Sequence, residues 1–212
     1  MKRSISIVTM LLMAMTAGCV TVPVPKMEQQ EASGIAISVK IKPPIGWPSK
    51  DADKVYFAKL DSRGDIQQSE VIPSNYGKDG RIYLLNVTPG DYVAVVAWNK
   101  GAAPAPMQPG LSVTFNPGRI VFFPKDLVEL TRVSVGKGQV ACVGSYVLST
   151  SVFGDRDLVQ SHYENVMNLK WSLNVGWRGT LHEAKNDDNT KGECLRMAKE
   201  DLAEGGWTVT IK

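Results

Sequence analysis

Hydrophobic and polar residues alternate with a period of two over much of the chain, and this alternation predicts β-strands with one buried face. The clearest run is residues 34–42, where isoleucine or valine occupies every second position from Ile35 to Ile41. Comparable runs predict strands over residues 55–60, 66–72, 81–87, 92–98, 112–115, 120–123, 127–135 and 139–152. Turn residues at 62–65, 78–80, 88–91 and 136–138 separate several runs. Those at 62–65, 88–91 and 136–138 predict hairpins that pair 55–60 with 66–72, 81–87 with 92–98, and 127–135 with 139–152. We therefore expect residues 34–153 to form a mainly β domain, an antiparallel β-sandwich.

The pattern changes in residues 154–212, where helical and strand periods follow one another. Asp155 can cap a helix that runs to about residue 168, and residues 169–177 alternate strictly between apolar and polar. A polar loop is expected over 182–192, followed by a short helix over 193–203 that ends at two glycines. Residues 207–211 alternate again as a last strand. We expect this part to be a helix–strand–helix–strand extension packed on the sandwich, because about 60 residues bury too little surface to form a separate stable core.

The first 18 residues have the three parts of a secretory signal peptide. A positive start at Lys2 and Arg3 precedes an almost wholly apolar run over residues 5–15, and small residues stand just before Cys19. The apolar run is too short to span a bilayer, which takes about 20 residues. Residues 1–18 are therefore expected to direct export and to be removed.

The sequence Ala17-Gly18-Cys19 resembles the lipobox of bacterial lipoproteins, although Thr16 stands where that family usually has leucine. The resemblance implies that diacylglycerol is attached to the Cys19 sulfur and that the freed amine is acylated, with palmitate as the kind of chain. Several acyl chains on one residue give a firm anchor, since each buried CH₂ contributes about 0.8 kcal/mol. Val20 in place of aspartate implies, by the same resemblance, sorting to the outer membrane. The alternative is a secreted protein that is cut nearby and keeps Cys19 as an ordinary thiol.

Residues 19–33 are expected to connect the lipid to the domain. They include Pro23 and Pro25 with several polar residues and show no helical period. A fully extended tether over residues 20–33 would reach at most about 43 Å, at roughly 3.1 Å per residue. The alternative, an edge strand docked on the domain, is disfavoured by the two prolines.

Composition and charge narrow the classes of partner. Removing Lys2 and Arg3 with the signal peptide leaves 22 basic residues against 21 acidic ones, of the 24 and 21 in the whole chain. A mature chain so close to neutral has no electrostatic footprint for nucleic acid. The expected partners are the membrane, through the N-terminal lipid, and an envelope protein or glycan of unknown identity.

Two cysteines remain after anchoring. Cys142 lies in a predicted strand, and Cys194 shares a helical face with Ala198 and Leu202. Both are therefore expected to point inward, and a disulfide between them would tie the C-terminal helix to the sheet, as compartments outside the cytoplasm permit. The alternative is two separate buried thiols that act as small hydrophobes.

Residues 80–98, with Pro89-Gly90-Asp91-Tyr92 between two strand patterns, resemble an element of transthyretin-like and carboxypeptidase-regulatory-like β-sandwiches. Proline fixes φ at the first turn position and glycine accepts a positive φ at the next. The resemblance covers about twenty residues and implies a prealbumin- or immunoglobulin-like fold. Because many binding and structural modules share this element, it implies little about function.

The residues that most enzymes need are not grouped in this sequence. The two histidines, His162 and His182, lack cysteine or carboxylate neighbours at metal-ligand spacing, so no metal site or cofactor is predicted. The acidic run at 186–189 resembles a calcium loop only in part, and helix capping explains it better. No catalytic residue is predicted, and we expect a protein that is not an enzyme.

Two binding hypotheses remain for a lipid-anchored module. In the first, apolar residues in predicted loops contact an envelope partner; the candidates are Ile45, Trp47, Pro104 and Met107. These side chains could equally fold back over the edges of the core. In the second, the protein binds carbohydrate or peptidoglycan, with a tryptophan as stacking platform; the candidates are Trp171, Trp177 and Trp207. Their alternating context favours the core instead.

Overall fold

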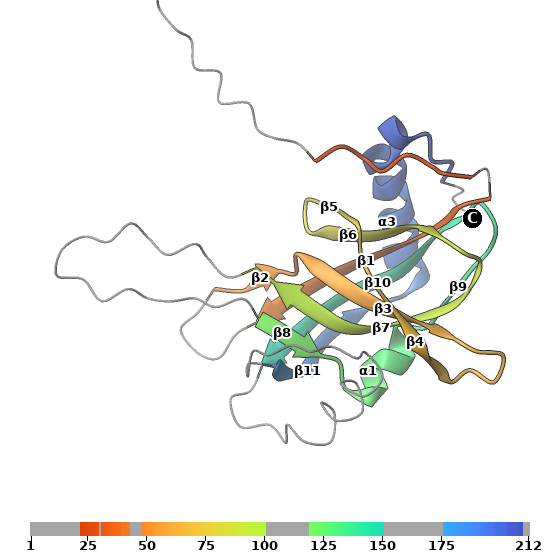
Figure 1. Ribbon diagram of the computed structural model, residues 1–212. Helices are drawn as coiled ribbons and strands as arrows, with labels where there is room; N and C mark the ends of the chain where they lie inside the picture. The colour runs from red at the N-terminus through yellow and green to blue at the C-terminus, as the bar shows by residue number, and fades with distance from the viewer. Residues whose placement is uncertain (1–21, 30, 43–47, 101–118, 151–175, 210–212) are drawn as a thin grey trace, which may run out of the picture.

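The computed structural model describes residues 22–29, 31–42, 48–100, 119–150 and 176–209, and shows a mainly β protein with helices on its surface (Figure 1). The strands are β1 (Ser33–Lys42), β2 (Lys50–Asp51), β3 (Lys54–Leu60), β4 (Ile66–Pro73), β5 (Tyr76–Lys78), β6 (Arg81–Val87), β7 (Gly90–Asn99), β8 (Arg119–Phe122), β9 (Val133–Val135), β10 (Val140–Thr150) and β11 (Gly176–Lys185). The helices are α1 (Lys125–Leu130) and α3 (Asp188–Asp201), followed by the 3₁₀ turn η1 (Ala203–Gly205). The expected mainly β class is confirmed.

The strands form two sheets that share β11. The first, sheet A, has the order β5-β6-β1-β10, with β2 paired to the end of β1. The second, sheet B, has the order β4-β3-β7-β8, with β9 paired to the start of β7. Residues 176–178 of β11 pair with β8, and residues 179–185 pair with β10. The C-terminal part of the chain therefore supplies a strand between the two sheets, rather than lying wholly outside them.

Two apolar clusters arise from the two faces of sheet A. Ile35, Ile37, Val39 and Ile41 of β1 face sheet B, where they join a large inner core that includes Phe57. The opposite face of β1 carries Ala36, which is also fully buried, because α3 packs over this half of the strand. The second cluster, called here the α3 cluster, contains Cys142 and Cys194 and also Tyr83, Leu85, Leu202 and Trp207. The described chain thus has three layers, namely α3, sheet A and sheet B.

The predicted hairpin of 55–60 with 66–72 is confirmed, because β3 and β4 pair antiparallel. The other two predicted hairpins are wrong, although most of their strands exist. β6 pairs with β1 and β5 in sheet A, whereas β7 pairs with β3, β8 and β9 in sheet B. Likewise β9 pairs with β7, whereas β10 pairs with β1 and β11. Short turns suggested local pairing, but here each one carries the chain from one sheet to the other.

The arrangement also departs from a purely antiparallel sandwich. β1 and β10 are parallel, with pairs from Gly34 opposite Val140 to Lys42 opposite Ser149. β8 and the start of β11 are parallel as well. Parallel neighbours must be joined by crossover connections, which alternation of apolar residues cannot reveal.

Residues 127–135, predicted as one strand, divide into a helix and a shorter strand. α1 begins after Pro124, whose fixed φ suits the start of a helix, and it buries Leu127 and Val128. The helix ends at Thr131, whose side-chain oxygen accepts a hydrogen bond from the Ala94 amide of β7 at 2.9 Å. Only Val133–Val135 then continue as β9.

The C-terminal boundaries differ from those expected. The predicted polar loop over 182–192 is occupied by the end of β11 and the first turn of α3. Asp187 caps α3 by accepting a hydrogen bond from the Thr190 amide at 2.9 Å, so the capping interpretation of this acidic run is confirmed. Residues 207–209 are buried at Trp207 and Val209 but form no strand, while the predicted helix over 155–168 and nearly all of the predicted strand over 169–177 lie outside the described residues.

Candidate functional site

A polar hollow of about 380 Å³ lies on the outer face of sheet A, beyond the half that α3 covers. We call it the polar groove; it is lined by Ser38, Val39, Lys40, Asp51, Asp79, Gly80, Ser145, Val147, Glu183 and Lys185. A volume of this size falls within the range of small-ligand sites.

Strand alternation and register position the residues of the polar groove. Because Val39 and Ile41 point into the inner core, the intervening Lys40 points outward. Ser38 stands opposite Ser145 of β10, which stands opposite Lys185 of β11. In the next row, Lys40 stands opposite Val147 and Val147 opposite Glu183. Three neighbouring strands therefore present two adjacent rows of polar side chains, interrupted by one valine.

A tight turn and a short strand close one rim of the groove. Asp79 and Gly80 both have positive φ, at 48° and 76°, as a turn between β5 and β6 requires. A Cβ atom at Gly80 would lie 3.0 Å from Oδ2 of Asp51 on β2, so glycine lets the turn approach this carboxylate. The sequence predicted the turn at 78–80, and this prediction is confirmed.

Each charge on the groove wall has an opposite charge close by. The Lys185 ammonium lies 2.8 Å from a Glu183 carboxylate oxygen, and Lys40 lies 3.9 Å from Asp51. The hydrogen bond from Lys185 lowers the pKa of Glu183, and the same bond raises the pKa of Lys185. Both groups are therefore charged at neutral pH, whereas a general acid or base works best with a pKa near the operating pH. This chemistry suits reversible recognition of a polar ligand better than proton transfer.

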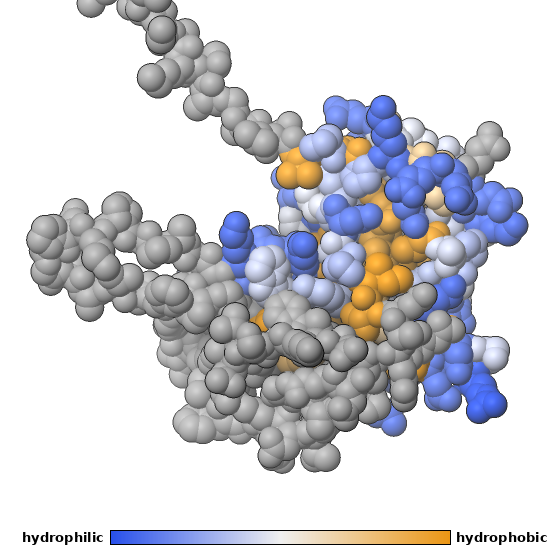
Figure 2. Space-filling model, viewed as in Figure 1, coloured by the Kyte–Doolittle hydropathy of each residue, from blue (hydrophilic) through white to orange (hydrophobic). Residues whose placement is uncertain are grey.

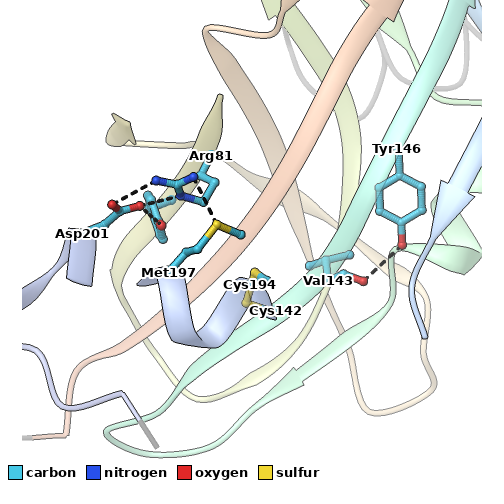
Figure 3. The surroundings of a disulfide bond; sticks show 8 residues. Arg81, Cys142, Val143, Tyr146, Cys194, Met197 and Asp201 are labelled. Atoms are coloured by element: carbon cyan, nitrogen blue, oxygen red, sulfur yellow. Dashed lines mark hydrogen bonds and ion pairs between the residues drawn. A yellow bond between two sulfur atoms is a disulfide. The ribbon is translucent and has the colours of Figure 1, made fainter. Parts of the chain in front are cut away.

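Next to the groove, a buried ionic cluster fastens α3 to sheet A (Figure 3). Asp201, at the end of α3, is only 4% exposed. Its two carboxylate oxygens accept hydrogen bonds from Arg81 at 2.6 and 3.1 Å, and one of them accepts another from the Tyr83 hydroxyl at 2.5 Å. Burial alone would raise the pKa of Asp201, but these hydrogen bonds and the positive charges of Arg81 and Lys78 bring it below its ordinary value. The cluster holds structure together and is not exposed enough to receive a ligand.

A disulfide between Cys142 of β10 and Cys194 of α3 forms the second link (Figure 3). Their Cα atoms lie 6.2 Å apart, and both residues are less than a tenth exposed. Of the two alternatives that the sequence left open, the bridge is therefore present and the pair of separate thiols is not. α3 is held at its middle by a covalent bond and at its end by the Asp201 cluster.

The predicted loop residues lie outside the described part of the chain, as does Cys19. Ile45 and Trp47 belong to residues 43–47, and Pro104 and Met107 belong to residues 101–118. β2, which follows residues 43–47, lies beside the end of β7, which precedes residues 101–118. The Asn99 side chain donates a hydrogen bond to the Asp51 carbonyl at 2.8 Å, and the Lys100 amide donates one to Asp53 at 2.6 Å.

Of the three tryptophans considered as stacking platforms for sugars, the structure describes the side chain of Trp207 alone. Trp207 is 6% exposed in the α3 cluster, and its indole N–H donates a hydrogen bond to the Pro25 carbonyl at 2.8 Å. It therefore cannot stack on a sugar, because its ring is buried and its polar edge is occupied. Trp171 and the side chain of Trp177 lie outside the described residues.

Sequence reasoning missed the polar groove altogether. Its residues come from β1, β2, β10, β11 and the turn before β6, and no two of those strands were predicted to be neighbours. The outward polar positions of residues 34–42 were the only available signal, and such positions usually face solvent.

Within residues 22–29, 31–42, 48–100, 119–150 and 176–209, no group of three or more histidine, cysteine or acidic residues could hold a metal ion. In the same residues, none of the helices has the length and apolar character needed to cross a membrane. Comparison with known proteins gives no match, whether to a family model, to a curated protein or to a solved structure.

Proposed function

We propose that this chain is an exported, lipid-anchored envelope protein whose β-sandwich domain binds a partner and is not an enzyme. The observation that carries the proposal is the assignment of its three cysteines. Cys142 and Cys194 pair in a disulfide, which persists in oxidising compartments outside the cytoplasm. The remaining cysteine, Cys19, follows the signal-peptide pattern at the position that lipoproteins acylate. Val20 after it supports sorting to the outer membrane.

A prealbumin- or immunoglobulin-like classification of the sandwich is part of the proposal. Tyr92, in the element that resembles transthyretin-like domains, is almost fully buried. Its hydroxyl donates a hydrogen bond back to the Thr88 carbonyl at 2.7 Å. A tyrosine that bonds to backbone a few residues upstream is a feature of immunoglobulin-type sandwiches. The parallel pairing of β1 with β10 is a departure that such a classification has to accommodate.

The polar groove supports binding over catalysis. Its charged groups are paired and exposed, so they can exchange partners with a ligand at little cost in desolvation. An envelope protein could use these groups together with the predicted loop residues, whose flanking strands end at Asp51 and Asn99. We propose this as the principal function.

A glycan or peptidoglycan fragment is the second candidate, and the groove gives a specific reason for it. The hydroxyls of Ser38 and Ser145 stand in one row and Glu183 in the next, which offers neighbouring donors and acceptors to the hydroxyls of a sugar. Soluble peptidoglycan fragments are expected to bind the wild type and to bind Glu183→Gln less well in a calorimetric titration. Lys137→Gln, an exposed lysine in the turn before β10, is the control. Equal binding by all three proteins would contradict the groove as a glycan site.

The intact mass of protein extracted from membranes tests the proposal as a whole. The expected mass begins at residue 19 and carries acyl chains, and Cys19→Ala is expected to lose them. Thr21→Ala, two residues away, is the matched control that should remain acylated. Reduction should add two hydrogens as the Cys142–Cys194 bond opens. An unacylated wild-type mass would refute the anchor, and an unchanged mass on reduction would refute the argument from the disulfide.

A further inference from the structure

Part of the stretch expected to be a tether, within residues 22–29, is bound to the domain. Residues 22–29, called here the N-terminal segment, lie against η1 and the end of β6 (Figure 1). The Met27 amide donates a hydrogen bond to the Gly205 carbonyl at 3.2 Å. The Asn86 side chain contacts the segment twice, because its amide nitrogen donates to the Lys26 carbonyl at 2.9 Å and its oxygen accepts from the Glu28 amide at 3.1 Å.

Side-chain packing reinforces these hydrogen bonds. Val24 and Met27 are partly buried against the α3 cluster, and Trp207 donates to the Pro25 carbonyl. A Cβ atom at Gly205 would lie 2.8 Å from both the Pro25 carbonyl oxygen and a Val24 methyl. The segment therefore sits so close to η1 that only glycine fits at position 205.

Further contacts hold the chain just before and at the start of β1. The Glu31 carbonyl accepts a hydrogen bond from the Gly138 amide at 3.1 Å, and the Glu31 carboxylate pairs with Lys137 at 2.9 Å. Ser33 follows as the first residue of β1, and its hydroxyl donates to the Gly136 carbonyl at 2.7 Å. The chain is thus held at residues 24–28 and again at Glu31 and Ser33.

Docking sharply reduces the length of chain between lipid and domain. Val24 is the first residue that packs on the domain, so only residues 20–23 separate it from Cys19, which at roughly 3.1 Å per residue is a span of about 12 Å. The full stretch over residues 20–33 could have reached about 43 Å at the same rise. This short connection includes Val22, which is 67% exposed and apolar, and Figure 2 shows apolar surface where the described chain begins.

We infer that the domain rests directly on the bilayer that carries its lipid, with the surface formed by the N-terminal segment and η1 facing the headgroups. This inference rests on the proposed acylation of Cys19. The partner of this surface is a lipid bilayer, because the docked chain leaves no length for another layer between anchor and domain. Sheet B, in the layer remote from α3, then faces away from the membrane.

Energy transfer from the domain to labelled lipid headgroups tests the inference. The acylated full-length protein is reconstituted into phosphatidylethanolamine–phosphatidylglycerol vesicles that contain an acceptor-labelled headgroup. A fluorescent amino acid is placed either at exposed Glu204, next to the docked segment, or at exposed Arg63, in the turn between β3 and β4. Transfer is expected to be clearly higher from position 204 than from position 63.

Two independent variants release the N-terminal segment. Asn86→Gly removes both side-chain hydrogen bonds and keeps the positive φ of 64°, while Gly205→Ala places a methyl group against Pro25. Either variant is expected to abolish the difference in energy transfer between donors at positions 204 and 63. Their matched controls are Asp79→Gly, at another residue with positive φ, and Gly192→Ala, where a Cβ atom meets nothing within 4 Å. Both controls should keep the difference, and circular dichroism confirms that each variant is folded.

The outcomes separate this inference from the proposed function. Equal transfer from both positions in wild-type protein of confirmed acylated mass would overturn the inference and leave the anchor intact. The inference would also be overturned if the difference in energy transfer disappeared in the control variants as well as in the two release variants. An unacylated protein that does not bind vesicles would overturn the anchor and the inference together.

Discussion

Removing the disulfide should destabilise the protein by about 4 kcal/mol. The change is the double substitution of Cys142 and Cys194 by alanine. The two residues are 52 positions apart, so the bond closes a long loop in the unfolded chain. For a loop of this length the entropy restored to the unfolded state corresponds to about 4 kcal/mol at 25 °C. Since small domains are stable by roughly 5–15 kcal/mol, this is a large share of the total.

Equilibrium unfolding in urea measures this loss. Tryptophan fluorescence is a suitable signal because Trp207 is buried in the α3 cluster with Cys142 and Cys194. The double-alanine variant should show a lower midpoint, and the wild type should shift in the same way when a reductant is added. The slope of the transition should be steeper for both, because an uncrosslinked unfolded chain exposes more surface.

A decrease of less than about 1 kcal/mol in the free energy of unfolding would refute this reasoning, because it would mean that the disulfide barely restricts the unfolded chain. Single substitutions provide a further check. Cys142→Ala and Cys194→Ala should each cost about as much as the pair, since either one opens the same loop. Additive costs would indicate instead that the two side chains contribute separately, through packing under α3.

Three other changes have expected outcomes that urea unfolding can measure. Asp201→Asn should cost about 3 kcal/mol at pH 7, because partly buried Arg81 would lose its buried counter-charge and keep only the exposed Asp79, 3.5 Å away. The pKa of Asp201 is lowered by folding, so its pairing stabilises the protein at neutral pH and is lost as the pH falls below about 4. The variant should therefore lose less stability in acid than the wild type does. Gly144→Ala should cost at least about 2 kcal/mol, because residue 144 has a φ of 135° and its Cβ would lie 2.6 Å from the Lys185 carbonyl oxygen. Phe57→Ala should cost about 3–5 kcal/mol by opening a cavity between the two sheets.

Each of these outcomes could fail in an informative way. An acid profile of Asp201→Asn parallel to that of the wild type would mean that other carboxylates control stability below pH 4. A neutral Gly144→Ala would imply that β10 and the end of β11 separate easily. A cost below about 1 kcal/mol for Phe57→Ala would contradict a tightly packed core between the sheets.

The sequence was a good guide to strands whose two faces differ in burial. Residues 34–42 alternate, and β1 covers Ser33–Lys42 with its isoleucines and valine in the inner core. The turn at 78–80 was predictable because Asp79 and Gly80 adopt the positive φ that such turns need. Capping by Asp187 was predictable for the same kind of reason, since a side-chain oxygen near an open amide acts locally.

Pairing between strands was predictable for the local hairpin of β3 and β4, but most other pairs depend on contacts between distant residues. The turns at 88–91 and 136–138 are compatible with hairpins, yet each connects the two sheets. The α1 helix was hidden inside a strand-like run because its apolar residues Leu127 and Val128 suit either structure. Its start at Pro124 was the one local signal that could have identified it.

The polar groove and the docked N-terminal segment share a further reason for being missed. Both depend on polar atoms that look solvent-exposed in the sequence, such as Lys40 and Asn86. Whether a polar side chain faces solvent, lines a groove or holds a neighbouring segment is decided by which backbone lies opposite it.

Three different kinds of long-range link meet on the side of the domain that bears α3. The disulfide at Cys194, the ion pair at Asp201 and the contact of Trp207 with the N-terminal segment all converge on the α3 cluster. If the proposed membrane anchor is present, force on it would act on the domain through the N-terminal segment, which contacts this cluster. A covalent bond and a buried ion pair at this position resist local opening better than apolar packing alone, because α3 cannot separate from sheet A without breaking both. The placement of the disulfide in the described chain is therefore physically consistent with attachment on this side, and the opposite layer, sheet B, is held by packing and backbone pairing.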